Sequence, residues 1–320
     1  MHEISFPRSL ICIETSAFAY CCSLKTLDFP EKLEGIGWNA FFSCESLTEV
    51  KLPASLRNAQ DAFSDCYNLG TVVIPDGIQA VCADAFPGCT ALEKNRQLLI
   101  QDSVLLRVYG AWTDLIIPEG VTTVNDCAFS YTSKEALQTL TIPETVQKIG
   151  MYFDDIPNLK ALDVPESVTE IGESFLWRCE SLRSVVLPRN LRNLPELSLM
   201  FCESLQYLVA PGIPFAELKE RRLVVPATVG YLCNSEKYAD QATVYQQYAN
   251  RQKKRLVPIL LGDDLVAGIA TYAANGQITK ANFDSVFLQP AIEANATECI
   301  AFLLEWKNQN LLTKADTYQI

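Results

Sequence analysis

Cysteine is the residue type with the most regular spacing in this chain, and thiols can bind metals, form disulfides or act as nucleophiles. None of the twelve cysteines forms a C-x-x-C pair, the common spacing of thiolate zinc ligands. The single histidine, His2, excludes histidine-based triads, Cys-His nucleophiles and zinc sites that need imidazole. Half of the cysteines share one position, three residues before a leucine: Cys21, Cys44, Cys66, Cys89, Cys179 and Cys202.

Two other residues, Thr132 and Ile156, fill this cysteine position elsewhere in the chain. The position therefore favours a small or apolar buried side chain over a reactive thiol, since free cysteine is among the most buried residue types. We predict a column of reduced cysteines in the core, with a disulfide or a four-cysteine metal site as the less favoured alternatives.

The remaining residues with catalytic potential lack the spacing that a reaction needs. Gly35-Ile36-Gly37 is not followed by the further glycine and the helix of a phosphate-binding loop. Acidic pairs such as Asp61 with Asp65 are explained by a solvated surface, because nothing in the sequence marks a pocket around them. The sequence therefore predicts a protein that is not an enzyme and that uses no cofactor and no metal.

The cysteine position belongs to a repeat that extends over two thirds of the chain. Residues 24–44 show one unit: Leu-x-x-Leu-x-apolar-Pro, two apolar positions three apart, then Ala-Phe-x-x-Cys. The prolines recur every 22 to 25 residues with one interval of 43, at Pro7, Pro30, Pro53, Pro75, Pro118, Pro143, Pro165, Pro188 and Pro211. This period predicts an α/β repeat solenoid, a leucine-rich repeat coil with a parallel β-sheet face, over residues 1–216 in about nine repeats.

Alternation within each short strand predicts which side chains face outward. In residues 47–53, Val50 and Leu52 should point into the coil while Lys51 points to solvent. The outward residues form the predicted partner-binding face, for which the candidates are Asp28, Lys51, Thr141, Asp163, Arg183 and Tyr207. Inside the coil, the Ala-Phe motif predicts an aromatic column of Phe18, Phe41, Phe63, Phe86, Phe129 and Phe153, continued by Leu176 and Leu199.

Two segments depart from the repeat. Residues 93–114 are an insertion, in which 97–109 read as a hairpin around Asp102-Ser103 that continues the sheet; a protruding active-site loop is the less favoured alternative. Residues 217–320 show helical spacing and predict a small all-α C-terminal domain, with possible N-caps at Asp263 or Asp264. Its helix pairs, with turns at Gly276 and Asn295, resemble ankyrin hairpins.

The one basic cluster lies in this helical segment and consists of Arg251, Lys253, Lys254 and Arg255. Basic residues near a helix C-terminus complement its dipole, which is the favoured interpretation. The alternative is a docking patch for an anion, an acidic partner or the acidic repeats themselves.

Charge and hydropathy limit the partners and the location. Residues 1–216 carry 15 Lys or Arg against 27 Asp or Glu, whereas residues 217–320 carry 11 of each. Such an acidic repeat surface repels phosphate backbones, so we expect no nucleic acid on the repeat face. No apolar window is long enough to span a membrane, and the N-terminus lacks the pattern of a secretory signal. We expect a cytoplasmic protein, or a fragment of a surface or secreted one.

Several units resemble the BspA-like, or Treponema-type, leucine-rich repeats. The resemblance lies in units such as Ile74-Pro75-Asp76-Gly77-Ile78 with Ala85-Phe86-Pro87-Gly88-Cys89, and covers about residues 4–215. It implies binding rather than catalysis, since surface members act as adhesins for host matrix proteins. The C-terminal segment is similar to helical tails on members from gut Firmicutes.

These observations favour a non-catalytic scaffold that binds a protein of unknown identity through the exposed face of its repeat sheet. One alternative is a cell-surface or secreted adhesin fragment that binds a host matrix protein. A less favoured alternative is an enzyme or toxin domain in the helical segment.

Overall fold

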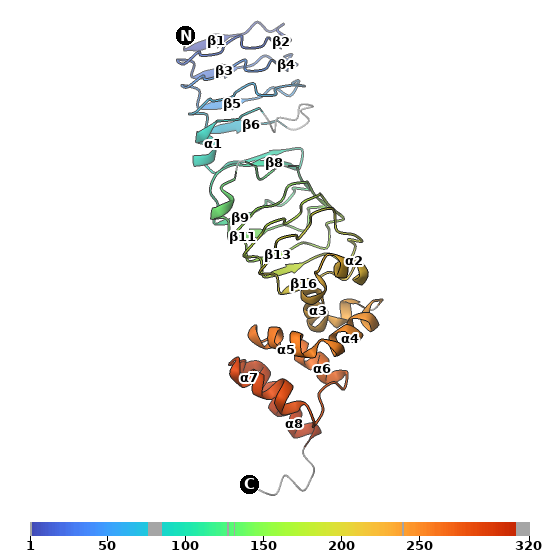
Figure 1. Ribbon diagram of the computed structural model, residues 1–320. Coiled ribbons are helices and arrows are strands. Elements are labelled where there is room, and N and C mark those ends of the chain that lie inside the picture. Colours follow the sequence, from blue (N-terminus) through green and yellow to red (C-terminus); the bar gives the residue numbers. More distant parts are fainter. Residues whose placement is uncertain (1, 76–84, 127, 131, 239, 312–320) are drawn as a thin grey trace. The chain divides into compact units, whose positions relative to one another are not determined.

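A computed structural model describes residues 2–75, 85–126, 128–130, 132–238 and 240–311 (Figure 1). The chain packs as two compact units. The repeat unit comprises Met1–Lys160, Ser167–Ser181 and Pro195–Glu203. The helical unit comprises Ala161–Glu166, Leu182–Leu194 and Ser204–Ile320. The domain boundary after residue 216 stays a prediction.

The repeat unit is a coil whose turns each contribute one three-residue strand to a parallel face. Neighbouring strands pair one repeat apart, as Ser5 opposite Asp28 and Val50 opposite Val72 show. The central residue of each strand is partly or fully buried while its neighbours are exposed, which confirms the predicted alternation. These strands are β1 (Glu3–Ser5), β3 (Thr26–Asp28), β5 (Glu49–Lys51), β6 (Thr71–Val73), β9 (Asp114–Ile116) and β11 (Thr139–Thr141) (Figure 1).

A second set of two-residue strands forms where each repeat returns. These are β2 (Cys12–Ile13), β4 (Gly35–Ile36), β10 (Thr123–Val124), β12 (Lys148–Ile149) and β14 (Glu170–Ile171). Successive repeats approach closely just after these strands. An added Cβ at Gly37 would lie only 2.5 Å from the backbone nitrogen of Thr15, so glycine is needed there. Short helical turns α1 (Thr90–Lys94) and η1 (Lys134–Ala136) complete the unit.

The insertion forms the expected hairpin, from β7 (Leu98–Gln101) and β8 (Val104–Val108). Asp102 and Ser103 link the strands with φ of 46° and 64°, the positive values that tight hairpin turns require. The hairpin continues a sheet, but the sheet is that of the return strands, in the order β14-β12-β10-β8-β7. The strand face instead resumes at β9, which pairs with β11.

Phenylalanine rings fill the interior of the repeat unit, as the Ala-Phe motif predicted. Stacked rings lie 5.2 to 5.5 Å apart from Phe18 through Phe41 and Phe63 to Phe86. Further along, Phe153 stacks on Phe175 at 5.6 Å. The prediction that Leu176 continues the column was therefore wrong in its register. Leu176 is buried too, but its φ of 58° lets the preceding Phe175 take the ring position.

The cysteine column is also present, and it has a hydrogen-bonding role that spacing alone did not show. Thiols at this position donate to the backbone carbonyl of a phenylalanine in the aromatic column, one repeat earlier. The bond runs from Cys66 to Phe41 at 3.1 Å and from Cys89 to Phe63 at 3.2 Å. Thr132 fills the same position and donates to the Val108 carbonyl at 2.8 Å. All ten described cysteines are free thiols. Burial raises the pKa of Cys179 to about 12, so this thiol stays protonated.

The helical unit combines three parallel strands with paired helices. The strands, in the order β13-β15-β16, are β13 (Ala161–Asp163), β15 (Ser184–Val186) and β16 (Tyr207–Val209). Helix α3 packs directly on β16, because Gly230 lets the helix approach: an added Cβ would lie 2.1 Å from the Leu208 carbonyl oxygen. The helical elements are α2 (Phe215–Glu220), α3 (Val224–Cys233), η2 (Ser235–Tyr238), α4 (Ala242–Arg251), α5 (Lys253–Gly262), α6 (Val266–Ala274), η3 (Phe283–Leu288), α7 (Gln289–Glu293) and α8 (Thr297–Asn310).

Three helical hairpins, α2–α3, α5–α6 and α7–α8, repeat one turn geometry. Each turn has three residues, and its middle residue, Arg222, Asp264 or Asn295, has a φ between 49° and 63°. The N–H after this residue bonds five residues back, a helix-ending bond that satisfies a free carbonyl, as from Leu265 to Leu260 at 2.7 Å. In the part of the chain that is described, no helix is long and apolar enough to cross a membrane.

The sequence suggested Asp264 as an N-cap of the helix that follows it, α6, but its side chain caps a different helix. Its carboxylate accepts the N–H groups of Glu298 and Cys299 at 3.0 and 2.9 Å, so it caps the N-terminus of α8. Slight burial acts to raise the pKa of this carboxyl, but the donated N–H groups outweigh it and the pKa lies below its usual value.

Candidate interaction surface

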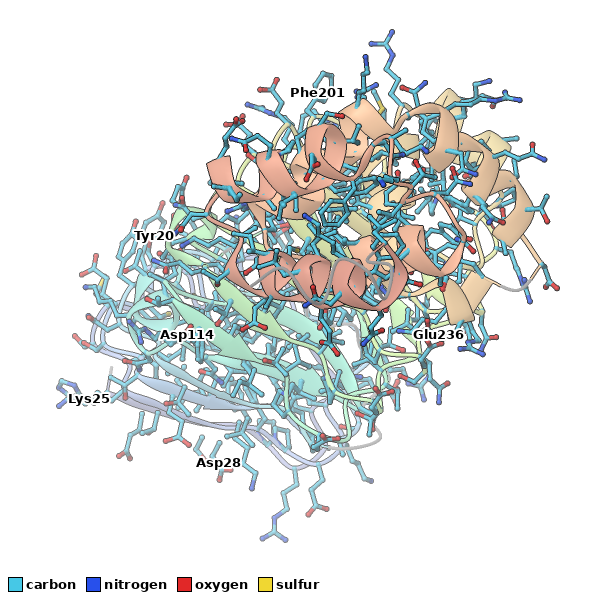
Figure 2. All side chains as sticks on the ribbon, turned by 90° about the horizontal axis from the view of Figure 1, so that it is seen from below. Tyr20, Lys25, Asp28, Asp114, Phe201 and Glu236 are labelled. Atoms are coloured by element: carbon cyan, nitrogen blue, oxygen red, sulfur yellow. The ribbon has the colours of Figure 1, made fainter. Side chains whose placement is uncertain are left out.

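The first strands of the repeat unit present two rows of outward side chains. One row holds Glu3, Thr26, Glu49 and Thr71, and the other holds Ser5, Asp28, Lys51 and Val73. Asp28 and Lys51, both predicted for the partner-binding face, are exposed. Within the described residues, neither makes an ion pair or a side-chain hydrogen bond. Asp28 projects from the sheet in Figure 2.

Three hollows lie along the first strands and the turns that follow them, and all three are lined by Asp28. The largest, about 660 Å³, also holds Lys51, so two of the predicted face residues meet in one hollow. Its remaining walls come from Leu27, Phe29, Glu31, Leu52, Pro53, Ala54 and Pro75. Prolines that define the repeat period therefore also form a rigid rim of the hollow.

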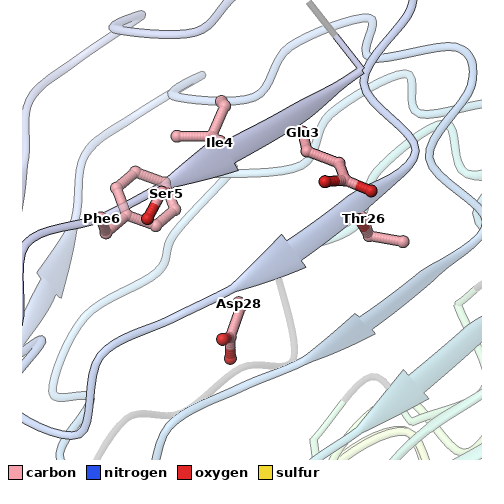
Figure 3. A pocket seen from close by; sticks show the side chains of 6 residues that line it. All are labelled: Glu3, Ile4, Ser5, Phe6, Thr26 and Asp28. Carbon is pink, nitrogen blue, oxygen red and sulfur yellow. The ribbon is translucent and has the colours of Figure 1, made fainter.

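The hollow of about 460 Å³ next to it is polar. Figure 3 shows the side chains of Glu3, Ser5, Thr26 and Asp28 along β1 and β3. Two carboxylates and two hydroxyls offer hydrogen-bond acceptors and donors to a ligand. Across the described residues, no three His, Cys, Asp or Glu side chains gather closely enough to hold a metal ion.

Thr141 occupies the same outward position on β11 and is exposed. Its neighbour on β9, Ile116, is 67% exposed, so the face is more apolar here than at β3 and β5. Beside them, the Thr139 hydroxyl donates to Asp114 Oδ1 at 2.5 Å.

The other three predicted face residues lie on strands or turns of the helical unit. Asp163 is exposed at the end of β13. Arg183 forms an ion pair with Asp263 at 2.7 Å, and the Tyr207 hydroxyl accepts the Asn234 side-chain N–H at 2.6 Å. Helical elements therefore already engage Arg183 and Tyr207, while Asp163 remains open.

The basic cluster spans two helices. Arg251 is in the last turn of α4, where the dipole interpretation holds, whereas Lys253, Lys254 and Arg255 form the first turn of α5. Positive charge at a helix N-terminus opposes the dipole, so helix stability does not explain these three residues. Lys253 Nζ donates to Gln277 Oε1 at 2.9 Å. Lys254 and Arg255 are exposed, and their role in docking stays a prediction.

Sequence reasoning missed the hollow itself. Pro53 was used only to define the repeat period and Phe29 was given no role, yet both line the same hollow. The available signal was that the proline follows each outward residue by two positions, which places every proline beside the row of Asp28 and Lys51.

Comparison with known proteins agrees with this architecture. A family model described as BspA type Leucine rich repeat region matches residues 1–97 and 108–219 in six copies. The gap between the two matched segments, residues 98–107, lies in the β7–β8 hairpin, and the match ends at residue 219. Comparison with curated proteins finds no match.

Several solved structures are similar at low identity. A leucine-rich repeat protein from Bacteroides ovatus is 21% identical, with a TM-score of 0.37, over 66% of this chain and 50% of its own. A leucine rich cell surface protein from Faecalibacterium prausnitzii is 19% identical, with a TM-score of 0.34, over 71% of this chain and 82% of its own. A leucine-rich repeat protein from Eubacterium ventriosum is 19% identical, with a TM-score of 0.36, over 66% of this chain and 60% of its own.

This chain thus spans about half the length of the Bacteroides ovatus protein. Because the family model matches well over half of the chain, this protein belongs to the BspA-type leucine-rich repeat family.

Proposed function

We propose that this protein is a non-catalytic interaction module that binds another protein on the exposed face of β1, β3, β5 and β6. The observation that carries the proposal is the hollow of about 660 Å³, where Asp28 and Lys51 lie exposed within a rim of prolines and Phe29. A charge of each sign beside an apolar wall can fix the orientation of a protein ligand.

The architecture supports this use of the face. Each strand is held to its neighbours by backbone hydrogen bonds and by a packed aromatic column, so binding need not order the surface first. The excess of carboxylates on residues 1–216 favours a partner with complementary basic residues and disfavours nucleic acid.

Site-specific photo-crosslinking tests the proposal. A photoreactive amino acid placed at position 28 or 51 should capture the same protein from cells of the source organism or from its surroundings. The control carries the photoreactive residue at Lys148, which is exposed on β12 of the return sheet and pairs with Glu170 at 3.3 Å. We expect adducts from positions 28 and 51 and not from 148.

Equal adducts from all three positions, or none from 28 and 51, would contradict the proposal. The identity of the captured protein separates the two forms of the function. A cytoplasmic protein would indicate an intracellular scaffold, whereas a host matrix protein would indicate an adhesin.

A further inference from the structure

A second surface of the repeat unit gathers apolar side chains that its core does not need. It consists of Tyr152, Trp177, Leu197, Met200 and Phe201, which we call the aromatic corner. Tyr152 is 49% exposed, Phe201 57%, and Leu197 and Met200 40% each. The rings of Trp177 and Phe201 meet edge to face, with centroids 6.2 Å apart.

Backbone hydrogen bonds between successive return turns hold the aromatic corner together. The N–H of Tyr152 donates to the Glu173 carbonyl at 3.2 Å, and that of Arg178 donates to the Met200 carbonyl at 2.9 Å. The Arg178 guanidinium lies 5.2 Å from the centre of the Trp177 ring. Aromatic residues, methionine and arginine are the types enriched in protein interfaces.

The fold does not require apolar residues at these positions. Phe201 directly precedes the cysteine position of its repeat, where other repeats have Ser43, Asp65 and Asp155. Met200 and Trp177 lie one residue earlier, where other repeats have Ser64 and Asp154. Because serine and aspartate satisfy the same turn, the exposed apolar residues have another use.

Carboxylates lie on the same turns as the aromatic corner. Five acidic residues on the same turns are exposed: Asp155, Glu173, Glu180, Glu196 and Glu203. The only basic residue among these turns is Arg178, whose guanidinium lies 4.0 Å from Glu180. An apolar centre with a negative rim is complementary to an apolar segment flanked by positive charges.

We propose that the aromatic corner docks an amphipathic, basic segment of a partner protein. Its apolar side chains would pack on Trp177 and Phe201, and its lysines or arginines would lie against the acidic rim. A second copy of this chain fits less well, because pairing two such corners would bring their carboxylates together. The inference rests on the proposed function only in treating the chain as an interaction module, and it concerns a different surface.

The test uses a labelled 18-residue helical peptide with leucine on one face and lysine on the other, titrated with the full chain. Fluorescence anisotropy gives the Kd. We expect Phe201→Ser to weaken binding at least about ten-fold, as loss of a central aromatic contact does. Reversing two rim charges, Glu173→Lys with Glu196→Lys, should have an effect of similar size.

Tyr20→Ser is the matched control. Tyr20 also directly precedes a cysteine, has a φ of 61° against 60° for Phe201, and packs edge to face on Phe42 with centroids 5.2 Å apart. Figure 2 labels Tyr20 and Phe201. This variant should bind the peptide within about two-fold of the unaltered chain, since an exposed ring outside the patch adds little. Circular dichroism and thermal unfolding confirm that each variant is folded.

Four results would overturn the proposal: no binding by the unaltered chain, equal losses for Tyr20→Ser and Phe201→Ser, equal binding of a peptide with glutamate in place of lysine, or a dimer that Phe201→Ser abolishes. Crosslinking from position 28 in the Phe201→Ser variant separates the two surfaces. Unchanged adducts there leave the proposed function intact even if the peptide result fails.

Discussion

The hydrogen bond from Cys66 to the preceding repeat can be measured by exchanging this residue for threonine and for valine. Cys66 is fully buried and its thiol lies 3.1 Å from the Phe41 carbonyl oxygen. Threonine and valine have nearly the same shape, but only threonine can donate a hydrogen bond. Thr132 shows that a threonine hydroxyl fits this position.

The expected difference follows from what remains bonded. The Phe41 carbonyl also accepts the Cys44 N–H at 3.3 Å, so valine would not leave this oxygen wholly without a partner. The loss should therefore be that of one net hydrogen bond, about 1 kcal/mol, rather than the ~3 kcal/mol of a fully unsatisfied buried group. We expect the free energy of unfolding of Cys66→Thr to exceed that of Cys66→Val by this amount.

Equilibrium unfolding in urea under reducing conditions gives the comparison, with circular dichroism and tryptophan fluorescence as separate probes. The comparison requires two-state unfolding, which repeat arrays do not always show. Agreement of the two probes and equal m-values for the two variants would establish it. The control is the same pair at Cys22, an exposed residue whose thiol makes only a long hydrogen bond, of 3.7 Å, to the Ser43 carbonyl oxygen. That pair should differ by only a few tenths of a kcal/mol. If the free energy of unfolding of Cys66→Val equals or exceeds that of Cys66→Thr, the hydrogen bonds of the cysteine column do not stabilise the coil.

Three further predictions concern single positions. Gly230→Ala should lower the melting temperature despite alanine's higher helix propensity, because its Cβ would meet the Leu208 backbone on β16. The control is Gly262→Ala, whose Cβ would meet no atom within 4 Å and which should be neutral or stabilising. Asp264→Ala should cost about 1 kcal/mol of unfolding free energy by removing the α8 cap, and the strain of alanine at the φ of 49° adds to this loss. Because the folded-state pKa of Asp264 is lowered from 3.8, the cap contribution is present above about pH 4 and lost as pH falls through that lower value, so the difference between the two proteins in urea unfolding should shrink in acid. Ser103→Gly should raise stability by up to about 1 kcal/mol in thermal unfolding, since glycine adopts the positive φ of the hairpin turn without strain, and a loss of stability would contradict that turn geometry.

The repeat period and the types of buried residue were sufficient to predict the coil. A three-residue strand with one face on the core and one in solvent buries its central side chain, so Val50 and Leu115 had to be apolar and their neighbours did not. The same argument placed Asp28 and Lys51 on the exposed face, since alternation depends only on the neighbouring residues. It could not show that they share a hollow with Pro75, because a hollow depends on three successive repeats.

What the sequence by itself determined is the local part of this protein: the period, the buried columns, the hairpin and the acidic charge of the repeats. The tertiary structure decided which distant residues meet. It joined the hairpin to the return sheet, placed Phe175 rather than Leu176 in the aromatic column and brought Asp264 to the start of a helix 33 residues later. It also assembled the aromatic corner from separate turns. Periodicity reports which residues are buried, but contacts between units depend on how each backbone turn directs its side chains, and that direction is set by packing against neighbouring repeats.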